Sequence, residues 1–258
     1  MAPVAGKKKK IADQAPSAEA RAPALRHKRL SKKAQQSAET KDKVIDAAER
    51  LLADYGFYGI TIRMVAEGAG IDTSLLHYHF VNKQGLFDAV LQRRADVVTR
   101  VCMESMEAYL KACRGKVTVD GALESYVRPI LNLLANGDDG WRNYFALLAQ
   151  ISNASTWGGT IMARHFDPMV KRFIELLRIA FPDAAPIEFY WSYHFFVGSL
   201  MSTLANTGRI EPLSGHTVRT GDLASLEPRL LTYTVAGIRR LCTGGGPAPI
   251  KAQRAKRA

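Results

Sequence analysis

Apolar residues recur at intervals of three and four between Val44 and Leu241, a spacing that places one apolar stripe along a helix. The long segments beyond about Ala95 show none of the alternation between apolar and polar residues that marks strands. We therefore expect an all-α fold of about nine helices. A small N-terminal domain of three helices is expected to precede a larger helical domain.

The small domain carries the signals of two short helices joined by a tight turn. After a first helix at about residues 41–55, Thr61 can cap a second helix that Gly70 ends, and Asp72 or Thr73 can cap a third. Two short helices joined by three or four residues that include a glycine have the geometry of a helix-turn-helix. The second helix of such a pair enters the major groove of DNA, so the pattern predicts a DNA-binding domain.

Two stretches of this domain carry a family resemblance. They read GFYGITIRMVAEGAGI at residues 56–71 and LLHYHFVNKQGLF at residues 75–87. Together, over roughly Lys41 to Leu91, they resemble the DNA-binding domain of the tetracycline-repressor (TetR) family. The resemblance implies a homodimer, a palindromic double-stranded DNA operator, a helical ligand-binding domain after the fourth helix, and repression that a ligand relieves.

The helix-turn-helix geometry and the resemblance together select the residues expected to contact DNA. Side chains at the amino end of a helix in the major groove reach base edges, and the preceding helix braces the backbone. Hydroxyl groups at that end can cap the helix instead of meeting DNA. Ser74 stands where many relatives have glycine, so the operator sequence is expected to differ from the operators of those relatives. The expected contacts are Thr61, Arg63, Thr73, Ser74, His77, Tyr78, His79 and Lys83, the last implied as a phosphate contact.

The net charge of +12 is concentrated at the two ends of the chain. Residues 1–36 hold ten Lys or Arg and two acidic residues, and residues 244–258 hold four basic residues and no acidic one. Such ends, rich in Ala, Pro, Gly and charge, are expected to be disordered, and beside a DNA-binding domain they can neutralise phosphates. The expected parts are a disordered basic arm (1–36), the helix-turn-helix domain (37–95), a ligand-binding and dimerisation domain (96–243) and a disordered basic tail (244–258).

Large apolar side chains concentrate in the second domain and suit the lining of a hydrophobic ligand pocket, with ordinary core packing as the alternative. The expected lining residues are Trp141, Tyr144, Phe145, Trp157, Met162, Phe166, Phe173, Trp191, His194 and Phe195. The stretch from Arg164 to Leu204 resembles regulators that respond to fatty acids or acyl thioesters. That resemblance implies a small hydrophobic effector, fatty acyl or aromatic.

Two long helices at about residues 187–207 and 226–241 are expected to form the dimer interface. The resemblance implies a four-helix bundle from two subunits, and packing within one subunit is the alternative. The residues expected at the interface are Trp191, Phe195, Gly198, Met201, Leu231, Val235, Ile238 and Leu241.

Within the second domain, the pair Asp167-Pro168 predicts the start of a helix that runs to about Phe181. Asp167 can cap the helix and proline fits its first turn.

An enzyme, for example a small helical acyl-processing enzyme, is the main rival class. The sequence has no Gly-rich phosphate loop, no nucleophile turn, no zinc spacing and no paired carboxylates placed for acid-base chemistry. His77 and His79 lie two apart and do not share a helix face, so neither a metal site nor a cofactor is expected. A ligand-responsive repressor is the favoured function, and an activator or dual regulator is the alternative within the same family.

The sequence shows no export or membrane signal. No window reaches the roughly 18 apolar residues that a membrane span needs, and the N-terminus lacks the apolar stretch of a signal peptide. We expect a cytoplasmic bacterial protein that joins the nucleoid when bound to DNA and has no membrane partner. The sequence does not identify the effector, the operator or the regulated genes.

Overall fold

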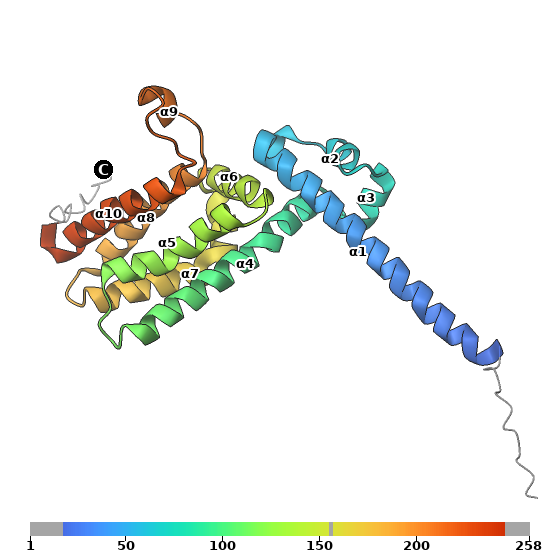
Figure 1. Cartoon of the computed structure of the whole chain (residues 1–258), viewed down its shortest axis with the longest axis horizontal. Coiled ribbons are helices and arrows are strands. Elements are labelled where there is room, and N and C mark those ends of the chain that lie inside the picture. The colour runs from blue at the N-terminus through green and yellow to red at the C-terminus, as the bar shows by residue number, and fades with distance from the viewer. Residues whose placement is uncertain (1–17, 155–156, 246–258) are drawn as a thin grey trace, which may run out of the picture. The chain divides into compact units, whose positions relative to one another are not determined.

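The computed structural model describes residues 18–154 and 157–245, and within these ranges it contains helices and no strand (Figure 1). The expected all-α fold is confirmed. The ten α-helices of this described part are α1 Ala18–Gly59, α2 Ile62–Ala69, α3 Thr73–His79, α4 Lys83–Ala112, α5 Val119–Asn136, α6 Gly140–Ser152, α7 Gly158–Ala180, α8 Pro186–Leu204, α9 Ile210–Leu213 and α10 Leu223–Arg240. A short π-helical turn, Leu241–Gly245, follows α10.

Helix α1 begins at Ala18, well before the start near residue 41 that the sequence predicted. Residues 18–36 are therefore helical where disorder was expected. Apart from Pro23, the chain from residue 18 to residue 55 has neither glycine nor proline and is rich in Ala, Lys, Arg and Leu, which are strong helix formers. Extending an existing helix also avoids the cost of nucleation. The rest of the expected basic arm (1–17) and most of the expected tail (246–258) lie outside the described residues.

The chain divides into two compact units, Met1–Lys43 and Val44–Ala258. All the sites described below belong to the second unit. We call its residues 44–80 the reading head; they comprise α1 from Val44 onward, α2 and α3. The remaining helices of this unit form a bundle in which α4 packs on α5 and α7, α6 on α7 and α8, and α10 on α5 and α8.

The helix-turn-helix has the caps that its sequence predicts. The Thr61 hydroxyl accepts a hydrogen bond from the Met64 amide at 3.2 Å, and Gly70 ends α2 in the left-handed conformation (φ 65°). Asp72, and not Thr73, caps α3, because its carboxylate accepts from the Ser74 amide at 2.7 Å. Sequence reasoning left both residues open as the cap of α3, and the structure assigns Asp72.

Helix α7 begins at Gly158, ten residues before the predicted start at Pro168. Pro168 lies inside the helix, where the missing amide and the ring clash cost about 3 kcal/mol. Because Phe166, Met169 and Phe173 are buried around the proline, the burial of this apolar face offsets the local cost. A proline is therefore an unreliable sequence signal for the start of a helix when the residues before and after it are buried along one helical face.

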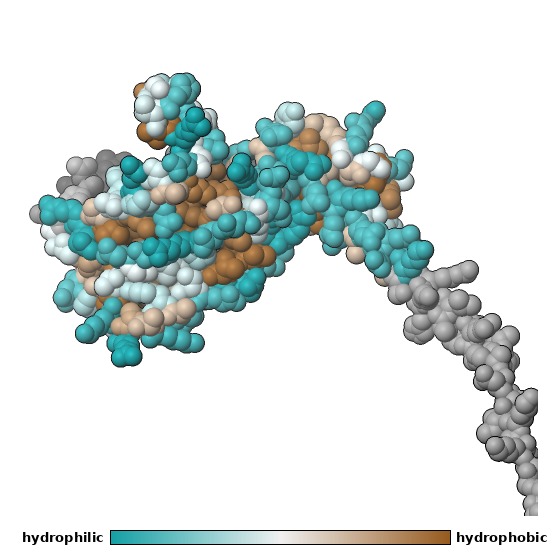
Figure 2. All heavy atoms as spheres, in the orientation of Figure 1, coloured by the Kyte–Doolittle hydropathy of each residue, from teal (hydrophilic) through white to brown (hydrophobic). Residues whose placement is uncertain are grey.

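The core is continuous through the second unit and consists of side chains from both the reading head and the bundle. Figure 2 shows the surface, where hydrophobic side chains appear between hydrophilic ones over the bundle and near α2 and α3. Among the described helices, none combines the length and the apolar character needed to cross a bilayer. The same part of the chain contains no group of three or more His, Cys, Asp or Glu side chains that could hold a metal ion.

Candidate functional site

Helix α3 presents one face to solvent and the other to the core. Leu76 and Phe80 are buried, whereas His77 and Tyr78 are exposed, Tyr78 with 79% of its surface accessible. Ser74, in the first turn, is exposed as well, and Thr73 and His79 are half-buried. The helix therefore has a firm anchor and an outward face rich in hydrogen-bonding groups.

Arg63 lies on the exposed surface of α2, where its Nε donates to Glu67 Oε1 at 2.8 Å. Both side chains are largely exposed, so this ion pair contributes little and is easily exchanged. The guanidinium is thus available to a phosphate or a guanine edge. Thr61, beside it, is exposed but already holds the start of α2.

Lys83 is held against the protein and does not extend toward solvent. Its ammonium donates to the Ile60 carbonyl at 2.6 Å and lies 4.7 Å from the centre of the Phe57 ring. These contacts fasten the start of α4 to the turn between α1 and α2. A phosphate contact by Lys83 therefore requires the ammonium to use its remaining donors or to leave this position.

Two apolar side chains in α3 and just after it extend the exposed surface beyond the predicted contacts. Leu75 and Val81 are 39% and 89% exposed, respectively. Helical periodicity could have indicated Leu75, which follows Ser74 on the outward face. Asp72 adds a negative group, and hydrogen bonding from Ser74 lowers the pKa of the Asp72 carboxyl.

A small apolar cavity lies inside the bundle among α4, α5, α6, α7 and α8. Its volume is about 20 Å³, room for about one water molecule and far below the roughly 300 Å³ of a small ligand pocket. Phe145, Met162 and Phe166 of the expected pocket line it. Sequence reasoning missed Tyr126 and Tyr193; burial raises the pKa of both, that of Tyr193 to about 12, so both hydroxyls stay protonated.

The other expected pocket residues lie elsewhere. Trp141, Tyr144 and Phe173 are buried in the core without lining the cavity, and Trp157 packs against Phe57 and Phe87 beside the reading head. For the exposed side chains of α8 the pocket expectation is corrected: Trp191, His194 and Phe195 point away from the cavity. Helix α8 is apolar on both sides, and it is the opposite face, with Tyr193, Val197, Met201 and Leu204, that lines the cavity.

Helices α8 and α10 expose an aromatic face. Trp191 and Phe195 are 49% and 57% exposed with their rings stacked (centroids 5.6 Å apart, 21° between planes), and Tyr233 of α10 is 72% exposed. A shallow groove of about 390 Å³ runs between the two helices, and a methyl group added at Gly198 or Gly237 would meet no atom within 4 Å. We call this surface, formed by Trp191, Phe195, Gly198, Tyr233 and Gly237, the aromatic face.

The dimer expectation needs a correction for three residues. Met201, Val235 and Ile238 are buried within their own subunit and are not part of the aromatic face. Met201 lines the internal cavity, Val235 lines a groove between α5 and α10, and Ile238 lies at the bottom of the groove between α8 and α10. Leu231 and Leu241 are half-buried. The 3.6-residue period identified α8 and α10 as apolar helices, but a helix that is apolar on two sides gives no indication of which side faces outward.

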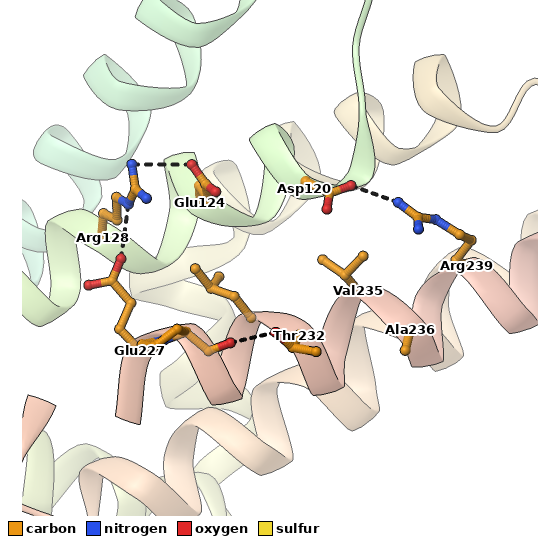
Figure 3. Close-up of a pocket in the computed structure, with 10 residues that line it drawn as sticks. Asp120, Glu124, Arg128, Glu227, Thr232, Val235, Ala236 and Arg239 are labelled. Atoms are coloured by element: carbon orange, nitrogen blue, oxygen red, sulfur yellow. Dashed lines mark hydrogen bonds and ion pairs between the residues drawn. The ribbon is translucent and has the colours of Figure 1, made fainter. Parts of the chain in front are cut away.

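A second groove separates α5 and α10 and has a volume of about 470 Å³ (Figure 3). Arg128 bridges Glu124 at 3.2 Å and Glu227 at 2.9 Å, and Arg239 pairs with Asp120 at 2.8 Å. The pairs of Arg128 with Glu227 and of Arg239 with Asp120 connect α5 to α10, whereas the pair of Arg128 with Glu124 lies within α5. Because these side chains are largely exposed, the pairs add little to the packing of α10 on α5 and α8.

The arrangement of an anchored α2–α3 pair with an outward hydrogen-bonding face, followed by a helical bundle, defines a helix-turn-helix DNA-binding protein. Comparison with known families agrees. Residues 44–90 match the family described as bacterial regulatory proteins, tetR family, and residues 124–237 match the tetracyclin repressor-like C-terminal domain. The chain belongs to the TetR family of bacterial regulatory proteins, as the resemblance of its reading head implied.

Individual relatives cover different shares of the chain. The tetracycline repressor protein class D of Escherichia coli is 36% identical over 75 residues, which are 28% of this chain and 34% of that protein. The match thus spans about a third of that relative's length. In fold, the chain is similar to the fatty acid degradation regulator FadR from Bacillus halodurans (TM-score 0.54, 16% identity, 78% of this chain and 96% of that one). It is similarly close to SmeT, the repressor of the Stenotrophomonas maltophilia multidrug efflux pump SmeDEF (TM-score 0.53, 17% identity, 82% and 97%).

Proposed function

We propose that this protein is a ligand-responsive transcriptional repressor that binds a palindromic operator as a homodimer. The observation that carries the proposal is the outward face of α3, where Ser74, His77 and Tyr78 are exposed on a helix anchored by Leu76 and Phe80. A helix so anchored can enter a major groove without rearranging its own core. Membership in a family of regulatory proteins sets the enzyme alternative aside.

The aromatic face supports the homodimer. Exposed aromatic side chains clustered on two helices mark an interaction surface, and a second copy offers the same face about a twofold axis. Two reading heads related by that axis would match two half-sites of a palindrome. Such a protein acts where the chromosome lies, in the bacterial cytoplasm.

Helix α4 can connect effector and operator. It begins at Lys83, next to the reading head, and reaches the internal cavity at Val98. Because the cavity has room for only about one water molecule, an effector has to displace the helices around it. An expanded bundle would shift α4 and change the separation of the two reading heads, which lowers operator affinity.

The lining of the cavity favours a hydrophobic effector that carries one polar group. Apolar side chains such as Phe145, Met162 and Phe166 would surround a chain or ring, and the Tyr126 and Tyr193 hydroxyls would donate to a carboxylate or thioester oxygen. A second candidate is a cleft of about 620 Å³ lined by Asp54, Arg142 and other polar residues. That cleft favours a polar effector.

The DNA-binding proposal predicts the effect of changes at Tyr78. An operator is first selected from a pool of randomised duplexes. We expect Tyr78→Ala to weaken operator binding by about 10- to 100-fold, the value of one good contact to DNA, while the thermal midpoint changes little because the side chain is exposed. Tyr78→Phe separates the hydroxyl from the ring, and Leu213→Ala, equally exposed on α9, is the control. Unchanged affinity of Tyr78→Ala would contradict this assignment.

The effector proposal predicts a response to palmitate. Ligand binding to the folded state raises the unfolding free energy, by about 2.7 kcal/mol at a concentration of 100 times Kd, so the thermal midpoint should rise and operator affinity should fall. We expect Tyr193→Phe to weaken palmitate binding about tenfold and the binding of methyl palmitate less, because the lost hydroxyl hydrogen-bonds the charged carboxylate. If palmitate leaves the thermal midpoint and the operator affinity unchanged, the hydrophobic effector is wrong and the polar cleft becomes the candidate.

A further inference from the structure

A buried ionic cluster joins the reading head to the bundle. Glu49 of α1 is 2% exposed, and its Oε2 accepts from Arg93 Nη2 and from Arg94 Nε of α4, each at 2.7 Å. Arg93 also pairs with Asp46 at 2.6 Å. A buried carboxylate is favourable only when cationic groups pair with it in good geometry. The position of Glu49 relative to Arg93 and Arg94 is therefore closely defined.

Arg94 extends the cluster to the loop before α6. Its Nη2 donates to Asp138 Oδ1 at 2.8 Å, and its guanidinium lies 4.7 Å from the centre of the Trp141 ring. The Gly140 backbone packs on the same groups, since a Cβ there would clash with Arg94 Nη2 and Glu49 Oε1. One guanidinium therefore contacts α1, the 137–139 loop and α6 at once.

Helix α6 is fastened to α1 at its other end as well. Gln150 Nε2 donates to the Ala53 carbonyl at 2.7 Å. Between the two attachments, Phe145 and Leu148 of α6 line the internal cavity. A displacement of α6 that enlarges the cavity must therefore pull on α1 or break these attachments.

We infer that Arg94 and Asp138 are positioning residues that set the angle of the reading head against α6, so that α1 and not only α4 connects the cavity to DNA recognition. The inference rests on the proposed binding of a palindromic operator by a dimer. The ion pair to Asp138 is the part that can be changed with little effect on folding, because Asp138 is 68% exposed while Arg94 keeps Glu49.

The test uses the full-length protein, the selected operator and a second operator with one base pair inserted between the half-sites. The insertion turns one half-site by about 35° and moves it about 3.4 Å, so wild type should prefer the original spacing by at least about tenfold. We expect Asp138→Asn to reduce this preference about three- to fivefold, because a loosened reading head accepts the altered spacing. Asp138→Glu, which keeps the charge, should restore it.

Asp46→Asn is the matched control, since it removes an equally exposed partner of the cluster that does not reach α6. Gly140→Ala is a second variant, which displaces the loop and should also reduce the spacing preference. Binding of the operator should slow amide hydrogen exchange in residues 138–150 of wild type but not of Asp138→Asn. Equal spacing preference and equal exchange in wild type, Asp138→Asn and Asp46→Asn would overturn the inference. If wild type itself shows no spacing preference, the proposed dimeric recognition fails instead.

Discussion

If the protein forms the proposed dimer, the double substitution Trp191→Asp with Phe195→Asp is expected to convert it into a monomer. Both side chains lie on the aromatic face, about half exposed in the single subunit, and a dimer would bury the introduced carboxylates without partners. Operator affinity should then fall by about 10²- to 10⁴-fold, because two linked reading heads bind as one unit only while the subunits stay together. Sedimentation equilibrium and operator titration measure the two effects.

Ile179→Asp is the control for this prediction. Ile179 is 48% exposed on α7 and lies outside the aromatic face, so the charge alone should leave both the mass and the operator affinity unchanged. A double variant that remains dimeric would show that the subunits associate through another surface. A monomer that still binds the palindrome with wild-type affinity would exclude the dimeric mode of recognition.

Glu49→Ala is expected to lower the free energy of unfolding by about 3–5 kcal/mol. The substitution leaves Arg93 and Arg94 without the carboxylate that both contact, and Arg94 is almost fully buried. Arg94 then keeps only the exposed Asp138, and Arg93 keeps only the exposed Asp46. Removing the one buried partner of a buried charge has an effect of this size, whereas the exposed pair of Arg63 and Glu67 contributes less than about 1 kcal/mol. Urea unfolding of Glu49→Ala and of the control Glu67→Ala compares the two.

The isosteric variant Glu49→Gln helps to interpret that measurement. It keeps an oxygen acceptor and the packing volume but removes the negative charge, so its effect should lie between wild type and Glu49→Ala. A loss below about 1 kcal/mol for Glu49→Ala would mean that water replaces the carboxylate at Arg94 and that the cluster contributes little to folding.

Several residues make contacts that the local sequence pattern did not predict, because tertiary packing determines those contacts. Lys83 was expected at a phosphate, yet its ammonium donates to Ile60. The residues of the buried cluster, Glu49, Arg94 and Asp138, are far apart in sequence and carry no motif, so their meeting depends on how α1, α4 and the loop before α6 pack. The sequence alone therefore gave no indication of this cluster.

The sequence by itself determined the class of fold and the recognition element. Capping residues, the glycine after α2 and the 3.6-residue period act within a few residues of one another, so they are readable without coordinates. Only the tertiary structure decided which side of α8 faces solvent, how small the cavity is and which charges pair across helices. These features depend on contacts between segments distant in the chain, and an apolar stripe looks the same whether its own core or a second subunit covers it.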